Sequence, residues 1–449
     1  MNFDTITAIA TASGVGGIGI IRLSGSEALK IAKKIFKVPN NLKSHEVIFG
    51  KIIDEQELID SCLLIYFKAP KSFTGEDVIE FHCHGNPFIL NKVLDLCIKY
   101  GARLAKAGEF TKRAFLNGKL DLTQAEAVYD LIHSKTSMSL KNANNQIEGK
   151  LSSKIKNVRD ELIKTLSHIE AIIDFPDEID DEPLSNFIPV VNKAYDLVVN
   201  LINTAEAGKI YRDGIKTAIV GKPNVGKSSL LNSLLRFDRA IVTDIEGTTR
   251  DTLEEYINIK GIPVQIVDTA GLRETSDIIE KIGIEKSFES IDKSQLVLFV
   301  ADGSKNLSEE EIRILNKLEE ENKSFIMVIN KIDLTDNFNL NNKNIENIAF
   351  ISAKYNKGIE KLEELIKNLI LKGKTDSSLD ININSRHKEI LYRAKESLVK
   401  SLDTINKNLP IDFLAIDIKA AIVNMGEIIG ENVSEEVITE IFANFCVGK

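Results

Sequence analysis

The first 118 residues alternate short apolar runs with stretches of helical spacing. Residues 19–23, 63–67 and 78–81 are rich in branched and aromatic side chains, and each run is about as long as one strand. Apolar positions between 26 and 36 and between 87 and 100 recur at the spacing of a helix face. The pattern predicts a compact α+β unit over residues 1–118.

Helical spacing then continues without strands from residue 120 to about residue 208. Ala125, Val128 and Leu131 follow one another three residues apart, which places them on one helix face. Segment 174–182 interrupts the pattern with six acidic residues and one proline in nine positions, and predicts an exposed loop. A further helix is expected over 188–207, with its end at Gly208.

Strands and helices alternate from residue 215 to residue 371, which is typical of a parallel α/β sheet. Apolar positions at helical spacing return beyond the polar link 375–385. Neither helical block has enough apolar surface to be stable alone, so the two are expected to pack together with the α/β unit inserted between them. The later helices are expected over 386–408, 412–426 and 434–445. The expected domains are residues 1–118, 119–213, 214–373 and 374–449, of which the second and fourth form one helical domain.

Residues 221–228, Gly-Lys-Pro-Asn-Val-Gly-Lys-Ser, match the phosphate-binding pattern Gly-x-x-x-x-Gly-Lys-[Ser/Thr]. An apolar run at 217–220 precedes them and a segment of helical spacing follows. Glycines let backbone N–H groups surround phosphates, and the helix N-terminus adds a positive dipole end. In this arrangement Lys227 reaches the outer phosphates and Ser228 binds Mg²⁺.

Two later segments supply candidate contacts to Mg²⁺ and the γ-phosphate. Residues 247–251, Gly-Thr-Thr-Arg-Asp, carry hydroxyls that can reach the metal ion. Asp268 ends the expected strand 264–267, at the position of a carboxylate that lies behind the Mg²⁺ ligands, and the N–H of Gly271 can meet the γ-phosphate.

Two more segments indicate that the base is guanine. Asp333 closes the sequence Asn-Lys-Ile-Asp after an apolar run, and its carboxylate can accept from guanine N1–H and from the exocyclic amine that adenine lacks. The backbone of 352–354 can contact the guanine oxygen. An ATPase would require the match at 330–333 to be accidental, so the sequence predicts a GTPase. The expected nucleotide-binding residues are Asn224, Val225, Gly226, Lys227, Ser228, Ser229, Thr243, Asp244, Ile245, Glu246, Gly247, Thr248, Thr249, Asp268, Thr269, Ala270, Gly271, Asn330, Lys331, Asp333, Ser352, Ala353 and Lys354.

One position departs from the Ras-type pattern. Leu272 stands where a glutamine usually orients the attacking water, and leucine cannot do so. Another residue must take that role, and the candidates are the acids Glu274, Asp277 and Glu280. The alternative is that each is an exposed acid without a role.

Composition and charge narrow the class of protein. The chain has 449 residues and a net charge of −9, which argues against a surface that binds nucleic acid throughout. No apolar run reaches the roughly 18 residues that a membrane span needs, and the first residues do not resemble a signal peptide. Four cysteines are too few and too scattered for a disulfide framework. We therefore expect a cytoplasmic protein without a membrane segment.

Beyond the GTPase segments, the sequence resembles the MnmE (TrmE) family of tRNA-modification GTPases over essentially its whole length. The segments that carry this resemblance are 72–77 (Ser-Phe-Thr-Gly-Glu-Asp), 108–111, 114–121, 247–251, 268–274 and 446–449. The family tail is commonly Cys-Ile-Gly-Lys, so Val447 is a conservative departure.

The resemblance implies an N-terminal α+β folate-binding and dimerisation domain, a helical domain, and a Ras-like P-loop GTPase α/β domain inserted in the helical one. It implies a tetrahydrofolate derivative of the 5-formyl or methylene type, bound by Arg22, Glu80, Lys119 and Lys449. Ser228 and Thr249 match Mg²⁺ positions. The K⁺ positions are Asn224, Thr243, Ile245 and Thr248. Glu280 matches the acid that orients water.

The resemblance also implies partners and a reaction. With an FAD-containing partner, MnmG, in a heterotetramer, the family builds a 5-carboxymethylaminomethyl-type group on the wobble uridine of certain tRNAs. Lys449 would bring Cys446 beside the one-carbon site, which favours a chemical role for this thiol. Two alternatives stay open: Cys446 closes the last helix beside Phe442 and Phe445, or the tail is disordered.

A second class of function is a binding switch, such as a ribosome-assembly or signalling GTPase. Such proteins share the GTPase segments but usually append an RNA-binding module with a basic Gly-x-x-Gly loop. The sequence has no convincing loop of this kind, and a switch has no need of the N-terminal segments or of Cys446. The sequence therefore favours a GTP hydrolase coupled to tRNA modification.

Overall fold

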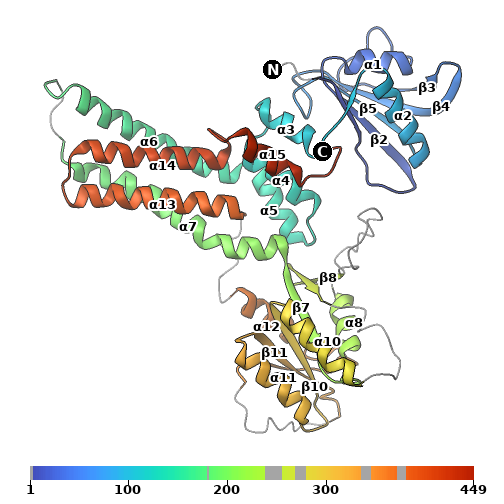
Figure 1. Ribbon diagram of the computed structural model, residues 1–449, viewed down its shortest axis with the longest axis vertical. Helices are drawn as coiled ribbons and strands as arrows, with labels where there is room; N and C mark the ends of the chain where they lie inside the picture. Colours follow the sequence, from blue (N-terminus) through green and yellow to red (C-terminus); the bar gives the residue numbers. More distant parts are fainter. Residues whose placement is uncertain (1–3, 179–181, 238–254, 268–279, 335–344, 372–380) are drawn as a thin grey trace.

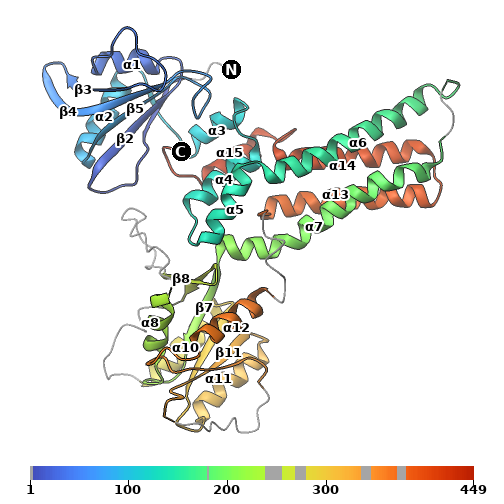
Figure 2. The ribbon, with the colours of Figure 1, turned by 180° about the vertical axis from the view of Figure 1, so that it is seen from behind.

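A computed structural model describes residues 4–178, 182–237, 255–267, 280–334, 345–371 and 381–449 of the chain. Figures 1 and 2 show three lobes: an N-terminal sheet with helices, an elongated helical lobe, and a second sheet with helices. The third lobe is inserted between two parts of the helical lobe, as the sequence predicts. The expected residue boundaries of the domains stay predictions.

The N-terminal lobe is a six-stranded mixed sheet with helices packed on one face. In chain order its elements are β1 (Ile6–Ile9), β2 (Gly16–Ser24), α1 (Ala28–Ile35), β3 (Val47–Asp54), β4 (Glu57–Phe67), β5 (Val78–Gly85), α2 (Pro87–Lys99) and β6 (Arg103–Leu104). The strand order is β3-β4-β5-β2-β1-β6.

Register separates the two faces of this sheet. Ile21 opposes Phe81 across β2 and β5, and both side chains are buried in the core with α1 and α2. Arg22 opposes Glu80 one position on, and successive side chains of a strand point to opposite faces. The sheet therefore presents this charged pair on the face away from those helices.

Four long helices form the core of the helical lobe, two from each side of the insertion. They are α6 (Lys150–Asp174), α7 (Ile188–Asp213), α13 (Ser385–Asn406) and α14 (Ile411–Ile429). One buried apolar cluster joins all four, so the predicted packing of the two helical blocks is confirmed. The shorter elements of this lobe are α4 (Leu122–Ile132), α5 (Ser137–Ile147), the 3₁₀ turn Leu184–Phe187 and α15 (Glu435–Ala443). Helix α3 (Glu109–Leu116) comes just before them and packs through Phe110 against β1 of the N-terminal lobe.

The expected helix end at Gly208 is wrong. Helix α7 continues to Asp213 and stops at Gly214, whose φ of 78° lies in the left-handed region that favours glycine. Gly208 lies inside the helix, where a Cβ atom would be 2.9 Å from Asn382 Oδ1. Its function is to let the segment that returns from the third lobe approach the helix closely.

The third lobe is a six-stranded sheet with strand order β12-β11-β10-β7-β9-β8, in which only β8 runs antiparallel to its neighbour. Its elements are β7 (Ile215–Val220), α8 (Lys227–Phe237), β8 (Glu255–Ile259), β9 (Ile262–Ile266), α10 (Glu280–Lys293), β10 (Leu296–Asp302), α11 (Glu309–Glu320), β11 (Ser324–Asn330), β12 (Ile348–Phe350) and α12 (Ile359–Leu371). Ligands of such sheets bind at the carboxyl ends of the parallel strands. In the described parts of the chain, no helix is both long and apolar enough to cross a membrane.

Candidate functional site

The phosphate-binding segment lies between the end of β7 and the start of α8, as the sequence predicts. Asn224 and Gly226 have φ values of 63° and 99°, so the backbone curls between strand and helix. Lys227 Nζ donates to the carbonyl oxygens of Gly221 and Lys222, both at 2.7 Å. Burial lowers the pKa of the Lys227 ammonium. The lysine side chain therefore lies across the loop, near the place where phosphates would bind.

Asn330, at the end of β11, joins the phosphate loop to the base-recognition segment. Its Nδ2 donates to the Val225 carbonyl at 2.8 Å, and its Oδ1 accepts from the Ala353 N–H at 3.0 Å. The side chain is 3% exposed. A Cβ atom on Gly226 would lie 2.2 Å from Asn330 Nδ2, so glycine is required for this bridge. One buried amide thus sets the spacing between the phosphate end and the base end of the site.

The other guanine-directed residues lie beside Asn330. Asp333 Oδ1 accepts from the hydroxyl of Ser352, which connects the two base-recognition segments. Lys331 has a φ of 67°, and its Nζ lies 2.7 Å from Asp302 Oδ2 at the end of β10. Burial works against the charge on Asp302, but the bond from Lys331 lowers the pKa of that carboxyl. The structure therefore assembles Asn330, Asp333 and Ser352 at one edge of the sheet.

Several expected site residues lie outside the described part of the chain. They are Thr243, Asp244, Ile245, Glu246, Gly247, Thr248, Thr249, Asp268, Thr269, Ala270 and Gly271, together with Leu272, Glu274 and Asp277. Glu280 is the first residue of α10, and only its backbone is described. Their proposed contacts stay predictions.

A second cluster lies on the open face of the N-terminal sheet. Arg22 Nε donates to Glu80 Oε1 at 2.8 Å, and His82 Nε2 lies 3.2 Å from Glu80 Oε2. The Arg22 guanidinium also lies 5.6 Å from the centre of the Phe110 ring, at the start of α3. The cluster is partly buried and combines a cation, a carboxylate and an aromatic face.

The C-terminal residues lie beside this cluster, although they follow Arg22 by more than 400 positions. Arg22 Nη1 donates to the Gly448 carbonyl at 3.2 Å. Burial lowers the pKa of the Lys449 ammonium, and the adjacent Arg22 charge lowers it further. Cys446 is exposed, whereas Phe442 and Phe445 are buried against α4. Lys119 Nζ donates to the Pro70 carbonyl at 3.1 Å.

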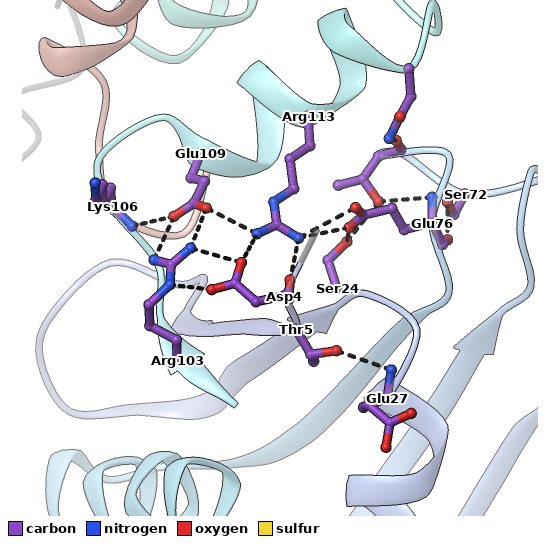
Figure 3. Close-up of polar contacts among 12 residues, drawn as sticks. Asp4, Thr5, Ser24, Glu27, Ser72, Glu76, Arg103, Lys106, Glu109 and Arg113 are labelled. Atoms are coloured by element: carbon purple, nitrogen blue, oxygen red, sulfur yellow. Dashed lines mark hydrogen bonds and ion pairs between the residues drawn. The ribbon is translucent and has the colours of Figure 1, made fainter. Parts of the chain in front are cut away.

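Figure 3 shows an ionic network, missed by the sequence reasoning, that anchors segment 72–77. Arg113 is 3% exposed and contacts Glu76, Asp4 and Glu109. Arg103 bonds Asp4 and Glu109 as well, and the Arg103 bonds hold the pKa of Asp4 down to about 2. The network joins the segment before β1, helix α3 and the loop 72–77. Glu109 and Arg113 are four residues apart, but Asp4 and Glu76 lie too far away in sequence for spacing to reveal the network.

A cavity of about 260 Å³ lies where the helical lobe meets the third lobe. Its lining includes Asp130 from α4, Arg212 from α7 and Asn382 from the returning segment. Burial raises the pKa of Asp130 to about 6, although Arg212 opposes the shift. The Asp130 carboxylate therefore lies at the junction between the helical lobe and the third lobe.

The sheet order, the phosphate loop and the guanine-directed segments define a P-loop GTPase domain of Ras-like fold. Comparison with known proteins extends this to the whole chain. The family model "MnmE helical domain" matches residues 122–446, and "GTP-binding protein TrmE N-terminus" matches residues 5–119. "tRNA modification GTPase MnmE" of Clostridioides difficile (strain 630) is 49% identical over 99% of both chains. The protein of that name from Acetivibrio thermocellus is 47% identical over the same shares, and the one from Desulforamulus reducens 46%. The chain belongs to the MnmE (TrmE) family.

Proposed function

We propose that the chain hydrolyses GTP and that hydrolysis drives modification of a tRNA wobble uridine at carbon 5. One observation carries the proposal: relatives named for tRNA modification and GTPase activity align with 99% of the chain, including both candidate sites. The buried Asn330 bridge supports the nucleotide part, because it fixes the two loops that GTP must contact together. The product is a 5-carboxymethylaminomethyl or related aminomethyl group.

Mg²⁺ and K⁺ are the metal ions we propose for the nucleotide site. Ser228 is the second residue of α8, so a hydroxyl oxygen lies at the phosphate end of that helix, where Mg²⁺ fits. Asn224 lies in the loop itself and offers an amide oxygen, which suits a monovalent cation. When bound, these ions would offset the charge that develops on the phosphates. By family resemblance we add Thr249 for Mg²⁺ and Thr243, Ile245 and Thr248 for K⁺, with Glu280 orienting the water.

The N-terminal cluster fits a reduced folate of the 5-formyl or methylene type. Arg22 keeps donors beyond those bonded to Glu80 and Gly448, and a guanidinium binds carboxylates or a ring edge in defined geometry. Lys449 adds a second cation, and Phe110 offers a flat apolar face. We assign Arg22, Glu80 and Lys449 to this ligand. Lys119 is assigned on family resemblance, and its bond to Pro70 would have to change for it to join the others.

Cys446 is proposed to act in the modification chemistry or in docking for it. Its exposure beside the Arg22 cluster supports this role, since a residue that closes the last helix would be buried with Phe445. Thiol chemistry requires access to solvent or substrate.

The proposed assembly is a homodimer that joins an FAD-containing MnmG partner in a heterotetramer and binds tRNA in the cytoplasm. FAD belongs to the partner alone. Phe49 of β3 opposes Leu63 of β4, and these apolar side chains are 73% and 39% exposed. Such an apolar surface on the sheet supports contact between N-terminal domains. All four cysteines are unpaired, which supports a reducing compartment.

The proposal is tested by reconstitution with the MnmG partner, tRNA, a reduced folate and GTP, followed by mass spectrometry of the nucleosides. We expect a modified wobble uridine with the native chain. Cys446→Ser should retain GTP turnover and lose the modification, whereas Val447→Ala should retain both. Full modification by Cys446→Ser would exclude a chemical role for the thiol. A lower melting temperature together with lost GTP turnover would assign it to packing. If the native chain gave no modified uridine, a binding switch would explain the sequence better.

A further inference from the structure

Residues 445–449, here named the tail, are held against the N-terminal lobe by backbone bonds. Gly108 N–H donates to the Cys446 carbonyl at 3.3 Å, and Phe110 N–H donates to the Lys449 carbonyl at 3.2 Å. Both donors lie at the start of α3, where N–H groups have no partner within the helix. Arg22 Nη1 supplies the third bond, to the Gly448 carbonyl at 3.2 Å. The three bonds span residues 446 to 449 and hold the backbone that carries Cys446.

The close approach depends on glycines on both sides of the contact. Gly448 has a φ of 94°, and a Cβ atom there would lie 2.4 Å from the Ile9 carbonyl oxygen of β1. Gly108 has a φ of 64°, and its Cβ would lie 2.6 Å from the Phe442 carbonyl oxygen. Backbone atoms cannot move aside as a flexible side chain can. A side chain at residue 448 would therefore force the tail away from the sheet.

Charged side chains of both signs meet at this contact. The Arg22 and Lys449 charges repel one another, and the Glu80 carboxylate partly offsets them. His82 is the further titratable group that contacts Glu80, and Cys446 is the thiol close to Lys449. An anion bound between the two cations would relieve their repulsion and so favour the docked tail.

We propose that the tail is a clamp on the N-terminal site, with Arg22 and Gly448 as the positioning residues that set Cys446 beside that site, and that an anionic ligand tightens the clamp. The identity of the ligand as a reduced folate rests on the proposed function. Arg22 contacts the tail and would contact the ligand with its remaining donors. Ligand binding and docking of the tail therefore both depend on this side chain. Two equilibria coupled in this way influence one another by the same factor.

Hydrogen exchange at the amides of Gly108 and Phe110 tests the clamp directly, because these amides are protected only while the tail is docked. The full-length Gly448→Ala chain should exchange them at least about tenfold faster, since three hydrogen bonds of ordinary strength are lost. Val447→Ala is the matched control, because Val447 is 53% exposed in the same tail. GTP turnover should be unchanged in both variants. Equal exchange in Gly448→Ala and Val447→Ala would overturn the clamp.

Adding 5-formyltetrahydrofolate tests the coupling. In the native chain the folate should slow exchange at both amides, and Gly448→Ala should bind it more weakly by about the same factor. Binding that leaves the exchange unchanged would overturn the coupling while the folate assignment stands. Failure of the native chain to bind the folate would refute the folate assignment and the coupling with it, and the two tail variants would still decide whether the clamp exists.

Discussion

Replacing Asn330 by alanine should weaken nucleotide binding more than any surface change in the same domain. The substitution removes the donor to the Val225 carbonyl and the acceptor for the Ala353 N–H, and both partners lie in a buried region. Leaving a buried polar group unpaired costs about 1–3 kcal/mol. Two such groups give a combined cost of about 2–4 kcal/mol, if water satisfies them in part.

That cost divides between stability and affinity. If the two loops keep their positions without Asn330, the GTPase domain loses stability; if they relax, GTP must reorder them and its affinity falls. A loss entirely in affinity would be roughly 30- to 700-fold, since 1.4 kcal/mol corresponds to tenfold. Chemical denaturation measures the loss of stability, and nucleotide titration measures the loss of binding free energy. The sum of these two losses is the quantity to compare with the expected cost.

The matched control is Asn368→Ala, because Asn368 lies exposed on α12 of the same lobe. We expect Asn368→Ala to change neither the stability nor the dissociation constant for GTP by more than a few tenths of a kcal/mol. If Asn330→Ala lost less than about 1 kcal/mol in stability and affinity together, the bridge would not hold the loops in place.

Three further predictions concern the base, the cation and pH. Asp333→Asn should shift preference from GTP toward xanthosine triphosphate, because the carboxylate that accepts from the guanine amine becomes an amide that donates; an unchanged preference in competition binding would contradict this. GTP turnover should be faster in KCl than in NaCl and should fall in Glu280→Ala. Equal rates in both salts would refute the role of K⁺, and full activity of Glu280→Ala would refute the role of this acid. Asp130 has its pKa raised from 3.8 to about 6 by burial, so its contribution to stability is greatest below pH 4 and is lost as pH rises through 6. Asp130→Asn should remove this dependence and stabilise the helical domain at pH 7.5 by up to about 3 kcal/mol, whereas equal urea midpoints for both chains at pH 5 and at pH 7.5 would disprove it.

Local pattern was sufficient for the architecture of the third lobe. The central strands β10 and β11 are nearly continuous apolar runs. Ser308 and Glu311 form a capping box, as their Ser-x-x-Glu spacing favours. The edge strand β3 was not predicted, because much of its surface is exposed and its strand character depends on pairing with β4. The wrong helix end at Gly208 has a similar origin. Whether an interior glycine ends a helix depends on what packs against it, here Asn382.

Motifs located the site residues better than they described their contacts. The sequence places Asn330 in a base-recognition segment but gives no sign that it bonds the Val225 carbonyl, 105 residues earlier. The contact between Arg22 and Gly448 is also beyond sequence reasoning, since 426 positions separate them and the acceptor is a backbone carbonyl. Contacts of this kind are set by how the lobes pack.

GTP hydrolysis by this chain is proposed to drive modification of the wobble uridine, and one measurement tests hydrolysis and modification together. The Asp333→Asn chain is combined with the MnmG partner, a reduced folate and tRNA, and supplied with GTP, xanthosine triphosphate or a non-hydrolysable analogue of the latter. Mass spectrometry of the digested tRNA then measures modified wobble uridine. We expect modification with xanthosine triphosphate, little with GTP and none with the analogue. Equal modification under all three conditions would contradict it, because the reaction would then proceed without nucleotide hydrolysis by this domain.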